Sequence, residues 1–192
     1  VVTSTGLTLR ENLDWWEQSE KRDFVRKQLK DSRNIDPEDV IHSLKNSKKK
    51  NMTSTVTFPK GNIAPEGSVV KSTAIDKTVI DDDGVYRKIG PARIFISEAD
   101  AIKAVKDKGA NGVKAGDIMV IACGGPKGTG MQEVAQITIA LKYLSYGKEV
   151  ALITDGRFSG VSTGACIGHI GPEALDGGPI GKLKENDLIE IN

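Results

Sequence analysis

The stretch EVALITDGRFSG, residues 149–160, places a short apolar run directly before a loop that contains glycine. The run from Val150 to Ile153 has the length and composition of a buried strand. The stretch DIMVIACGGPKGTG, residues 117–130, repeats this pattern. Mixed α/β sheets place ligands where strands end in such loops. The two stretches therefore predict a sheet. They also predict that a functional site lies at the edge where these two strands end.

Further strands and two helices complete the predicted domain, residues 53–192. Other β-rich segments span residues 53–58, 68–75, 93–96 and 187–191. One helix is expected to begin after its N-cap Ser97 and to end at Gly109. A second is expected from Met131 to Gly147, because apolar residues recur there at steps of three and four. Strands mixed with crossover helices predict a mixed α/β domain.

Residues 1–52 are predicted to form an N-terminal helical segment that precedes this domain. Residues 11–29 carry apolar side chains at helical spacing among many charges, which is typical of an amphipathic helix. Asp36 as a cap and Pro37 at the first helical position indicate a second, shorter helix. The lysine-rich residues 45–51 are expected to form a solvated loop.

Composition excludes several classes of protein. The 192 residues include 27 Lys and Arg against 26 Asp and Glu, so no net charge attracts nucleic acid or anionic lipid. Cys123 and Cys166 lack the spacing of a zinc or iron–sulfur site, which favours a reduced, cytoplasmic location. No apolar run reaches the roughly 18 residues of a membrane span, and no leader resembles a signal peptide. The chain begins at Val1 rather than Met, so we expect a fragment of a longer protein or a processed chain.

The first glycine-rich loop leads to Glu133. It lacks the Lys followed by Ser or Thr of a P-loop, and Glu133 stands where a third Rossmann glycine would be, which disfavours nucleotide binding. With Glu133 in the first turn of the expected helix, its carboxylate could complement the helix dipole or act as a ligand. The residues alone leave both interpretations open.

The second glycine-rich loop contains Arg157, Ser159, Ser162 and His169. A purely structural interpretation has a helix capped by one of the serines, a salt-bridged arginine and a buried, hydrogen-bonded histidine. The sequence GRFSG lacks the GxSxG pattern of a nucleophile elbow, so a serine hydrolase is not expected. The loop thus offers hydroxyls and a permanent cation, and the residues alone assign them no ligand.

Five blocks together resemble the C-terminal domain of the dihydroxy-acid dehydratase and phosphogluconate dehydratase family. They occur in family order: GNIAPEGSVVK (61–71), GPARIF (90–95), GPKGTGMQE (125–133), TDGRFSG (154–160) and GHIGPEALDGGPIG (168–181). TSTGLTLRENLDWW, at residues 3–16, resembles the segment that enters this half of such enzymes. The stretches LDWWEQSEKR and SGVSTGACIGHIGPEAL look most like the sugar-acid branch, the bacterial D-xylonate dehydratases.

The resemblance implies a swivelling β/β/α domain with a barrel-like mixed sheet. It implies removal of water from a 2,3-dihydroxy acid, such as D-xylonate or a related aldonate, to give a 2-keto-3-deoxy acid. Ser159 matches the family's base and Glu133 its C-terminal Mg²⁺ ligand. Arg157 and Ser162 are the expected substrate-binding residues, although Val161 and Ser162 stand where the family more usually has glycine or threonine.

The family's other metal ligands and its cluster cysteines belong to an N-terminal domain that this chain does not match. We therefore expect an iron–sulfur cluster, [2Fe–2S] or [4Fe–4S], bound by that domain, and an isolated chain that is inactive. The resemblance also implies a homo-oligomer and a small-molecule sugar acid as partner, without nucleic acid or membrane. Roles for Cys123, Cys166 and His169 stay open. The rival hypothesis is a non-catalytic module that binds phosphate or another anion in its glycine loops.

Overall fold

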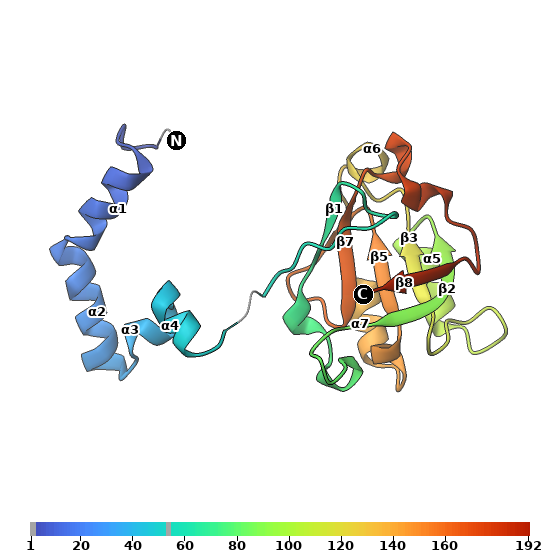
Figure 1. The fold of residues 1–192 in the computed structure, drawn as a ribbon, viewed down its shortest axis with the longest axis horizontal. Helices are drawn as coiled ribbons and strands as arrows, with labels where there is room; N and C mark the ends of the chain where they lie inside the picture. The colour runs from blue at the N-terminus through green and yellow to red at the C-terminus, as the bar shows by residue number, and fades with distance from the viewer. Residues whose placement is uncertain (1–2, 53–54) are drawn as a thin grey trace. The chain divides into compact units, whose positions relative to one another are not determined.

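The computed structural model describes residues 3–52 and 55–192, which form two compact units. The division falls between Val1–Thr53 and Ser54–Asn192 (Figure 1). Within the described ranges, no helix is both long enough and apolar enough to cross a bilayer.

The first unit consists of four helices: α1 (Leu9–Glu17), α2 (Glu20–Arg33), α3 (Pro37–Val40) and α4 (Leu44–Lys49). The expectation of one helix over residues 11–29 is wrong, because the Ser19 hydroxyl accepts the Arg22 N–H and begins a new helix. Asp36 caps α3 as predicted. The predicted loop at residues 45–51 is also wrong, since Ser43 caps α4 there. The lysines of that segment are nevertheless exposed.

None of the residues in these four helices is buried. The large apolar side chains stay open to solvent, with Trp15 62% and Phe24 61% exposed. A unit that buries so little apolar surface gains little stability from its own packing.

The second unit is built on a six-stranded sheet with the order β1-β7-β5-β3-β2-β8 (Figure 1). The strands are β1 (Gly67–Val70), β2 (Lys88–Phe95), β3 (Ile118–Ile121), β5 (Ala151–Thr154), β7 (Ala165–Gly171) and β8 (Leu188–Ile191). The four central strands run parallel, and β1 and β8 pair antiparallel at the edges. Sequence analysis missed β7, the glycine-containing partner of β5. Of the strand predicted at 53–58, only a Thr57 bridge to Val70 is present, and residues 53–54 lie outside the described ranges.

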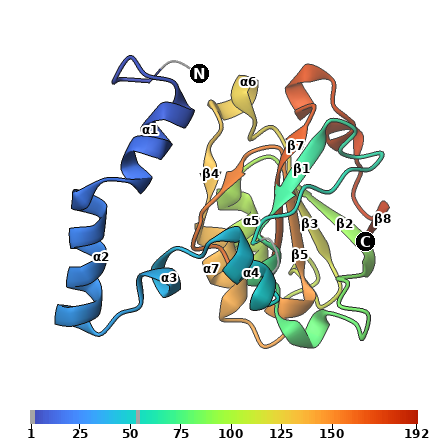
Figure 2. The ribbon, with the colours of Figure 1, turned by 60° about the vertical axis from the view of Figure 1, so that its left-hand side comes forward.

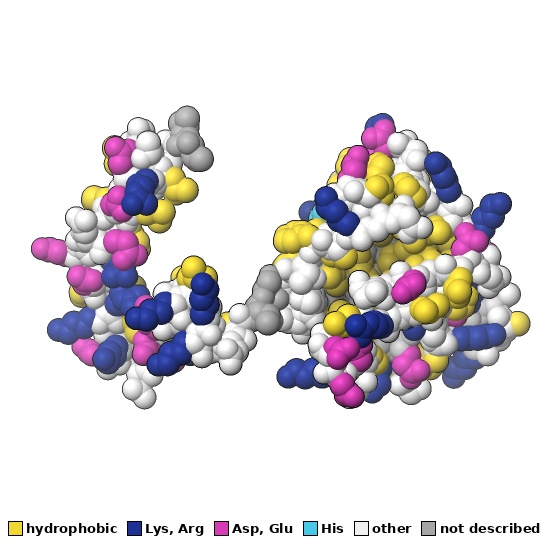
Figure 3. Space-filling view, in the orientation of Figure 1, with side chains coloured by type: hydrophobic (Ala, Val, Ile, Leu, Met, Phe, Trp, Pro, Cys, Tyr) yellow, Lys and Arg dark blue, Asp and Glu magenta, His cyan; other side chains and the backbone are white. Residues whose placement is uncertain are grey.

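Both faces of the sheet are covered, which explains why β3 and β5 are buried at every position. Alternate residues of β3 divide between two cores: Met119 and Ile121 pack with α5 and α7, whereas Ile118 and Val120 face the other side. Figure 2 shows these two helices together on one side of the sheet. On the opposite face, isoleucines of β5, β7 and β8 line a hollow of about 100 Å³, visible in Figure 3 as a yellow depression.

The helices of this unit differ in part from the prediction. Ser97 caps α5 (Glu98–Lys106) as expected, but the helix ends before Gly109. The helix expected from Met131 begins later, as α7 (Gln136–Lys142). The remaining short elements are α6 (Pro126–Thr129), β4 (Glu133–Val134), β6 (Arg157–Phe158) and the 3₁₀ turns η1 (Ser72–Ala74), η2 (Lys77–Val79), η3 (Gly147–Glu149), η4 (Ala174–Asp176) and η5 (Pro179–Lys182). The predicted class is confirmed: a mixed α/β fold preceded by helices, with a six-stranded mixed half-barrel sheet.

Candidate active site

The carboxyl ends of β3, β5 and β7 meet at one edge of the sheet, because these strands are parallel neighbours. The loops that leave this edge contain most of the residues singled out from the sequence. Residues 122–132 follow β3, residues 155–164 follow β5 and residues 172–178 follow β7. This is the place at which α/β sheets bind ligands.

Asp155, in the loop after β5, forms hydrogen bonds to the loops after β3 and β7. Sequence analysis did not identify this residue. Its side chain is 1% exposed. One carboxylate oxygen accepts the Gly124 N–H at 2.8 Å, and the other accepts the N–H groups of Cys123 at 3.2 Å and Ala174 at 2.8 Å. The signal in the sequence was an aspartate directly after a buried strand, a position at which an unpaired charge would be costly.

Two glycines let these segments approach one another. A Cβ on Gly156 would lie 2.9 Å from the Gln132 carbonyl oxygen and 3.0 Å from that of Gly124. A Cβ on Gly168 would lie 2.5 Å from Cδ1 of Phe158. The glycines therefore bring backbone and ring into contact.

Glu133 lies in a strand and not in the first turn of a helix, so that expectation is wrong. Strand β4 pairs in parallel with β6, and Glu133 is the register partner of Arg157. The Arg157 N–H donates to the Gln132 carbonyl at 3.1 Å, and its Nε donates to the Met131 carbonyl at 2.7 Å. The exposed Glu133 carboxylate has no hydrogen bond or ion pair within the described ranges. The backbone thus fixes this residue while its carboxylate stays available to a ligand.

Ser159 is half-buried at the start of the loop that joins β6 to β7. A Val161 N–H donates to its hydroxyl oxygen at 3.4 Å, the single backbone donor that the structure gives this oxygen in the described residues. The ammonium of Lys71 donates to the Gly160 carbonyl at 2.6 Å and so holds the loop from β1. Ser162 is 3% exposed, and its hydroxyl lies 3.2 Å from that of Thr138.

The purely structural interpretation of this loop fails. Residues 159–164 form no helix, and in the described parts of the chain Arg157 makes no ion pair. The side chain of His169 is exposed, with its ring edge-on to Phe158 at a centroid distance of 6.1 Å. Its backbone has φ 54°, and its N–H donates to the Gly156 carbonyl at 2.8 Å.

Backbone strain also concentrates at this edge of the sheet. The described non-glycine residues with positive φ are three asparagines in the two units and Cys123, Met131 and His169 here. Asparagine and histidine adopt this conformation more often than other residues do, whereas Cys123 and Met131 hold it at a cost of about 1–3 kcal/mol each. Such residues cluster at functional sites, where the surrounding structure holds them in place.

The two cysteines do not fit an iron–sulfur cluster. Burial raises the pKa of the Cys123 thiol, and the negative charges of Asp155 and Glu173 raise it further. Burial raises the pKa of Cys166 to about 12. Cluster ligation requires thiolates, which these environments disfavour. No cluster of three or more candidate metal ligands occurs among residues 3–52 and 55–192, so Glu133 offers a single hard oxygen ligand.

The start of α6 is already occupied by a side chain. The carboxylate of Glu173 accepts the Lys127 N–H at 2.8 and 3.1 Å, and Glu173 is 8% exposed. A Cβ on Gly125 would lie 2.3 Å from a carboxylate oxygen of Glu173, so this loop is closely packed against it. An internal anion at this helix start argues against the rival hypothesis of a phosphate-binding module.

Comparison with known proteins gives consistent matches. Residues 39–192 match the profile of the family described as dihydroxy-acid/6-phosphogluconate dehydratase C-terminal. The whole chain is 60% identical to D-xylonate dehydratase YjhG of Escherichia coli (strain K12) and covers 29% of that protein. D-xylonate dehydratase YagF of the same strain is 58% identical over 99% of the chain and 28% of its own length. A dihydroxy-acid dehydratase of Agathobacter rectalis is 46% identical over the whole chain and 29% of its own length. The chain thus spans less than a third of these relatives.

Proposed function

Since the chain belongs to the dihydroxy-acid/6-phosphogluconate dehydratase family, we propose that it is the C-terminal catalytic part of a sugar-acid dehydratase. Its higher identity to two D-xylonate dehydratases than to a dihydroxy-acid dehydratase supports D-xylonate or a related aldonate as substrate. The observation that carries the proposal is the β4–β6 pairing. It sets Glu133 opposite Arg157, two residues before Ser159, at the ligand-binding edge of the sheet.

In the proposed reaction, Ser159 removes the proton from C2 of a 2,3-dihydroxy acid. The C2–H electron pair forms the C2=C3 double bond, and the C3–O bond breaks. The C3 hydroxyl leaves as water with the proton that Ser159 took from C2, which returns Ser159 to its starting state, and the enol tautomerises to a 2-keto-3-deoxy acid. A serine hydroxyl is a weak acid, so Ser159 Oγ needs stabilisation as an alkoxide before it can accept the proton.

Glu133 is proposed to hold a Mg²⁺ ion, for which a free carboxylate oxygen on a fixed backbone is suited. When bound, this ion would stabilise negative charge on the substrate carboxylate and on the oxygen at C2. The iron–sulfur cluster of the complete enzyme is proposed to be bound outside this chain, because Cys123 and Cys166 do not suit it. We assign no step in this chain to a cluster.

Arg157 is proposed to orient the substrate carboxylate. Its Nε is bound to the Met131 carbonyl, which fixes the guanidinium while the residue stays exposed. A planar guanidinium can donate two parallel hydrogen bonds to a carboxylate. Ser162 as a substrate contact stays a prediction: its buried hydroxyl is engaged with Thr138, so direct contact requires the loop to rearrange.

The chain is further proposed to act with the remainder of a longer dehydratase, in a homo-oligomer. One metal ligand and one base make an incomplete site, and the relatives are more than three times as long. The exposed tryptophans of α1 offer apolar surface that such a partner could cover.

The test replaces Ser159 and Glu133 in the complete dehydratase. We expect Ser159→Ala to lower kcat about 10²- to 10⁴-fold, the range for loss of a general base. Glu133→Gln should raise the Mg²⁺ concentration needed for half-maximal activity. Ser145→Ala and Glu149→Gln are matched controls, because both residues are exposed and precede β5, at the opposite end of that strand. Full activity of Ser159→Ala would overturn the proposal.

A further inference from the structure

We infer that Asp155 is the positioning residue that sets Ser159 and Glu133 at their working separation. This inference rests on the proposed function of those two residues. Asp155 is remote from solvent, so it is assigned no contact with substrate. It acts through the backbone of the loops that leave β3, β5 and β7.

In its described contacts, the Asp155 carboxylate is surrounded by hydrogen-bond donors only. Its two oxygens accept three backbone N–H groups, from Cys123, Gly124 and Ala174, at 2.8–3.2 Å. An ionised carboxylate only accepts hydrogen bonds, whereas an asparagine side chain would direct its NH₂ group at one or more of these donors. Asn at this position would therefore break at least one of the three hydrogen bonds and set two donors against each other, although its shape is nearly unchanged.

The loops held by Asp155 carry the two proposed functional residues. Gly124 belongs to the loop between β3 and Glu133. Ser159 lies four residues after Asp155, in the segment that follows β5. The residues that follow Asp155 add two backbone hydrogen bonds: the Arg157 N–H donates to the Gln132 carbonyl, and the His169 N–H donates to the Gly156 carbonyl. A shift of Asp155 relative to Gly124 would therefore change the distance from the base to the metal ligand.

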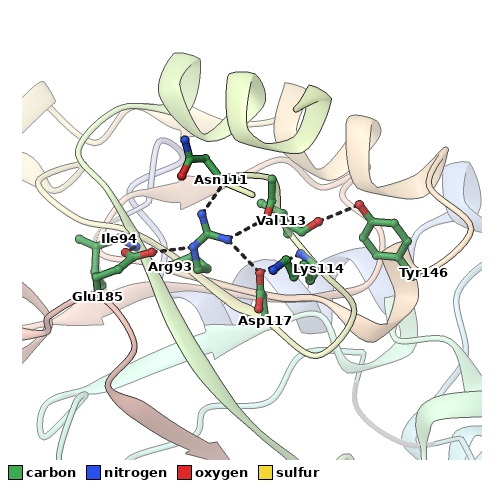
Figure 4. A network of polar contacts seen from close by, with 9 residues as sticks. Arg93, Ile94, Asn111, Val113, Lys114, Asp117, Tyr146 and Glu185 are labelled. Carbon is green, nitrogen blue, oxygen red and sulfur yellow. Dashed lines mark hydrogen bonds and ion pairs between the residues drawn. The ribbon is translucent and has the colours of Figure 1, made fainter. Parts of the chain in front are cut away.

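Asp117 provides a matched control at the opposite end of the sheet. It directly precedes β3, is 6% exposed, and accepts the Lys114 N–H at 2.8 Å and a bond from Arg93 at 3.2 Å. Figure 4 shows this network, in which Arg93 also binds Glu185 and the carbonyl of Asn111. Asp117→Asn weakens a buried ion pair, so it should lower the unfolding temperature. It should not displace the loops at the catalytic edge of the sheet.

The experiment compares Asp155→Asn, Asp117→Asn and Ser159→Ala in the complete enzyme over a Mg²⁺ titration, with kcat and KM taken at saturating Mg²⁺. We expect Asp155→Asn to lower kcat about tenfold to a hundredfold, as displacement of a catalytic group by about 1 Å does. KM should change less than kcat, and the Mg²⁺ requirement should rise. Asp117→Asn should keep kcat within about twofold at a similar or larger loss of unfolding temperature.

A second variant covers the case in which Asp155→Asn does not fold. Ala174 is the first residue of η4, a position that tolerates proline, and its N–H donates to Asp155. Ala174→Pro removes that donor and leaves the carboxylate intact. We expect the same direction in kcat with a smaller loss, and faster hydrogen exchange of the Cys123 and Gly124 amides.

The outcomes separate this inference from the function on which it rests. Loss of kcat in Asp155→Asn or Ala174→Pro, with kcat retained in Asp117→Asn, supports it. If both Asp155→Asn and Ala174→Pro only lower stability, and kcat per folded molecule is unchanged while Ser159→Ala is inactive, the positioning role is wrong and the proposed function stands. Activity of Ser159→Ala would overturn the function and, with it, the role of Asp155.

Discussion

Gly168 should be intolerant of a methyl group because of one neighbour, the ring of Phe158. A Cβ at this position would lie 2.5 Å from Cδ1 of Phe158 and 3.1 Å from the Gly156 carbonyl oxygen. Carbon atoms pack at about 3.5–4.0 Å, so the ring would have to move by about 1 Å. Gly168 does not have a positive φ, so alanine adds no backbone strain of that kind. We expect Gly168→Ala to lower the free energy of unfolding by about 1–3 kcal/mol, the usual cost of overpacking.

A double-mutant cycle isolates this contact. In a Phe158→Ala background the ring is absent, so Gly168→Ala should cost at least about 1 kcal/mol less than in the original sequence. Gly160→Ala is the control, since a Cβ there meets no atom within 4 Å. Unfolding in urea should be followed by far-ultraviolet circular dichroism, because both tryptophans, Trp15 and Trp16, lie in the helical unit.

The cycle would refute the reasoning if the two substitutions were additive within about 0.5 kcal/mol. Additivity would mean that the ring does not rest on Gly168. A large cost that persists without the ring would assign the close approach to the Gly156 carbonyl instead.

Two further predictions concern buried residues: the pH dependence of stability due to the Cys166 thiol, and the packing of Ile118. Burial raises the pKa of Cys166 from 9.0 to about 12, so the folded state keeps a proton that the unfolded state loses, and stability should fall as pH rises through this interval. Cys166→Ala should reduce that slope by at most about 1.4 kcal/mol per pH unit, measured by urea unfolding at pH 8 to 11, and an unchanged slope would contradict the assignment. Ile118→Ala should lower the free energy of unfolding by about 2–5 kcal/mol, because Ile118 is 0% exposed. Ile96→Ala, at a residue 74% exposed, should change it by less than about 0.5 kcal/mol, and equal effects at the two sites would contradict the assigned core.

Local signals predicted much of the sheet but not all of it. The apolar runs that became β3 and β5 are buried at every position, so composition and length were sufficient there. Strand β7 was missed because glycines interrupt its apolar residues, and its pairing with β5 compensates for their weak strand preference. In the N-terminal unit, apolar spacing continued through Ser19, and its capping hydroxyl was the overlooked signal that divides α1 from α2.

The candidate site shows the limit of periodicity more clearly. Val134, Ile137 and Leu141 are all buried, as the helical spacing predicted, yet Val134 belongs to β4. Burial of Val134 is compatible with either a helix or a strand at this position. Only the pairing of β4 with β6 shows that it is a strand. Glu133, which was predicted at the start of a helix, therefore lies in a strand. Its proposed role needs this placement, because a helix start would have offered its own N–H groups to the carboxylate.

The placement of Glu133 also bears on what the rest of the enzyme has to provide. Mg²⁺ prefers about six oxygen ligands in octahedral geometry, whereas the described residues contain no group of three or more candidate ligands around Glu133. The backbone ladder to β6 fixes the main chain of Glu133 beside Arg157, so its exposed carboxylate can approach an incoming metal only as far as the side chain reaches. Under the proposed function, the other ligands would have to come to Glu133. Correct seating of the remaining protein against this sheet edge would then decide both metal affinity and the distance from Ser159 to C2 of the substrate.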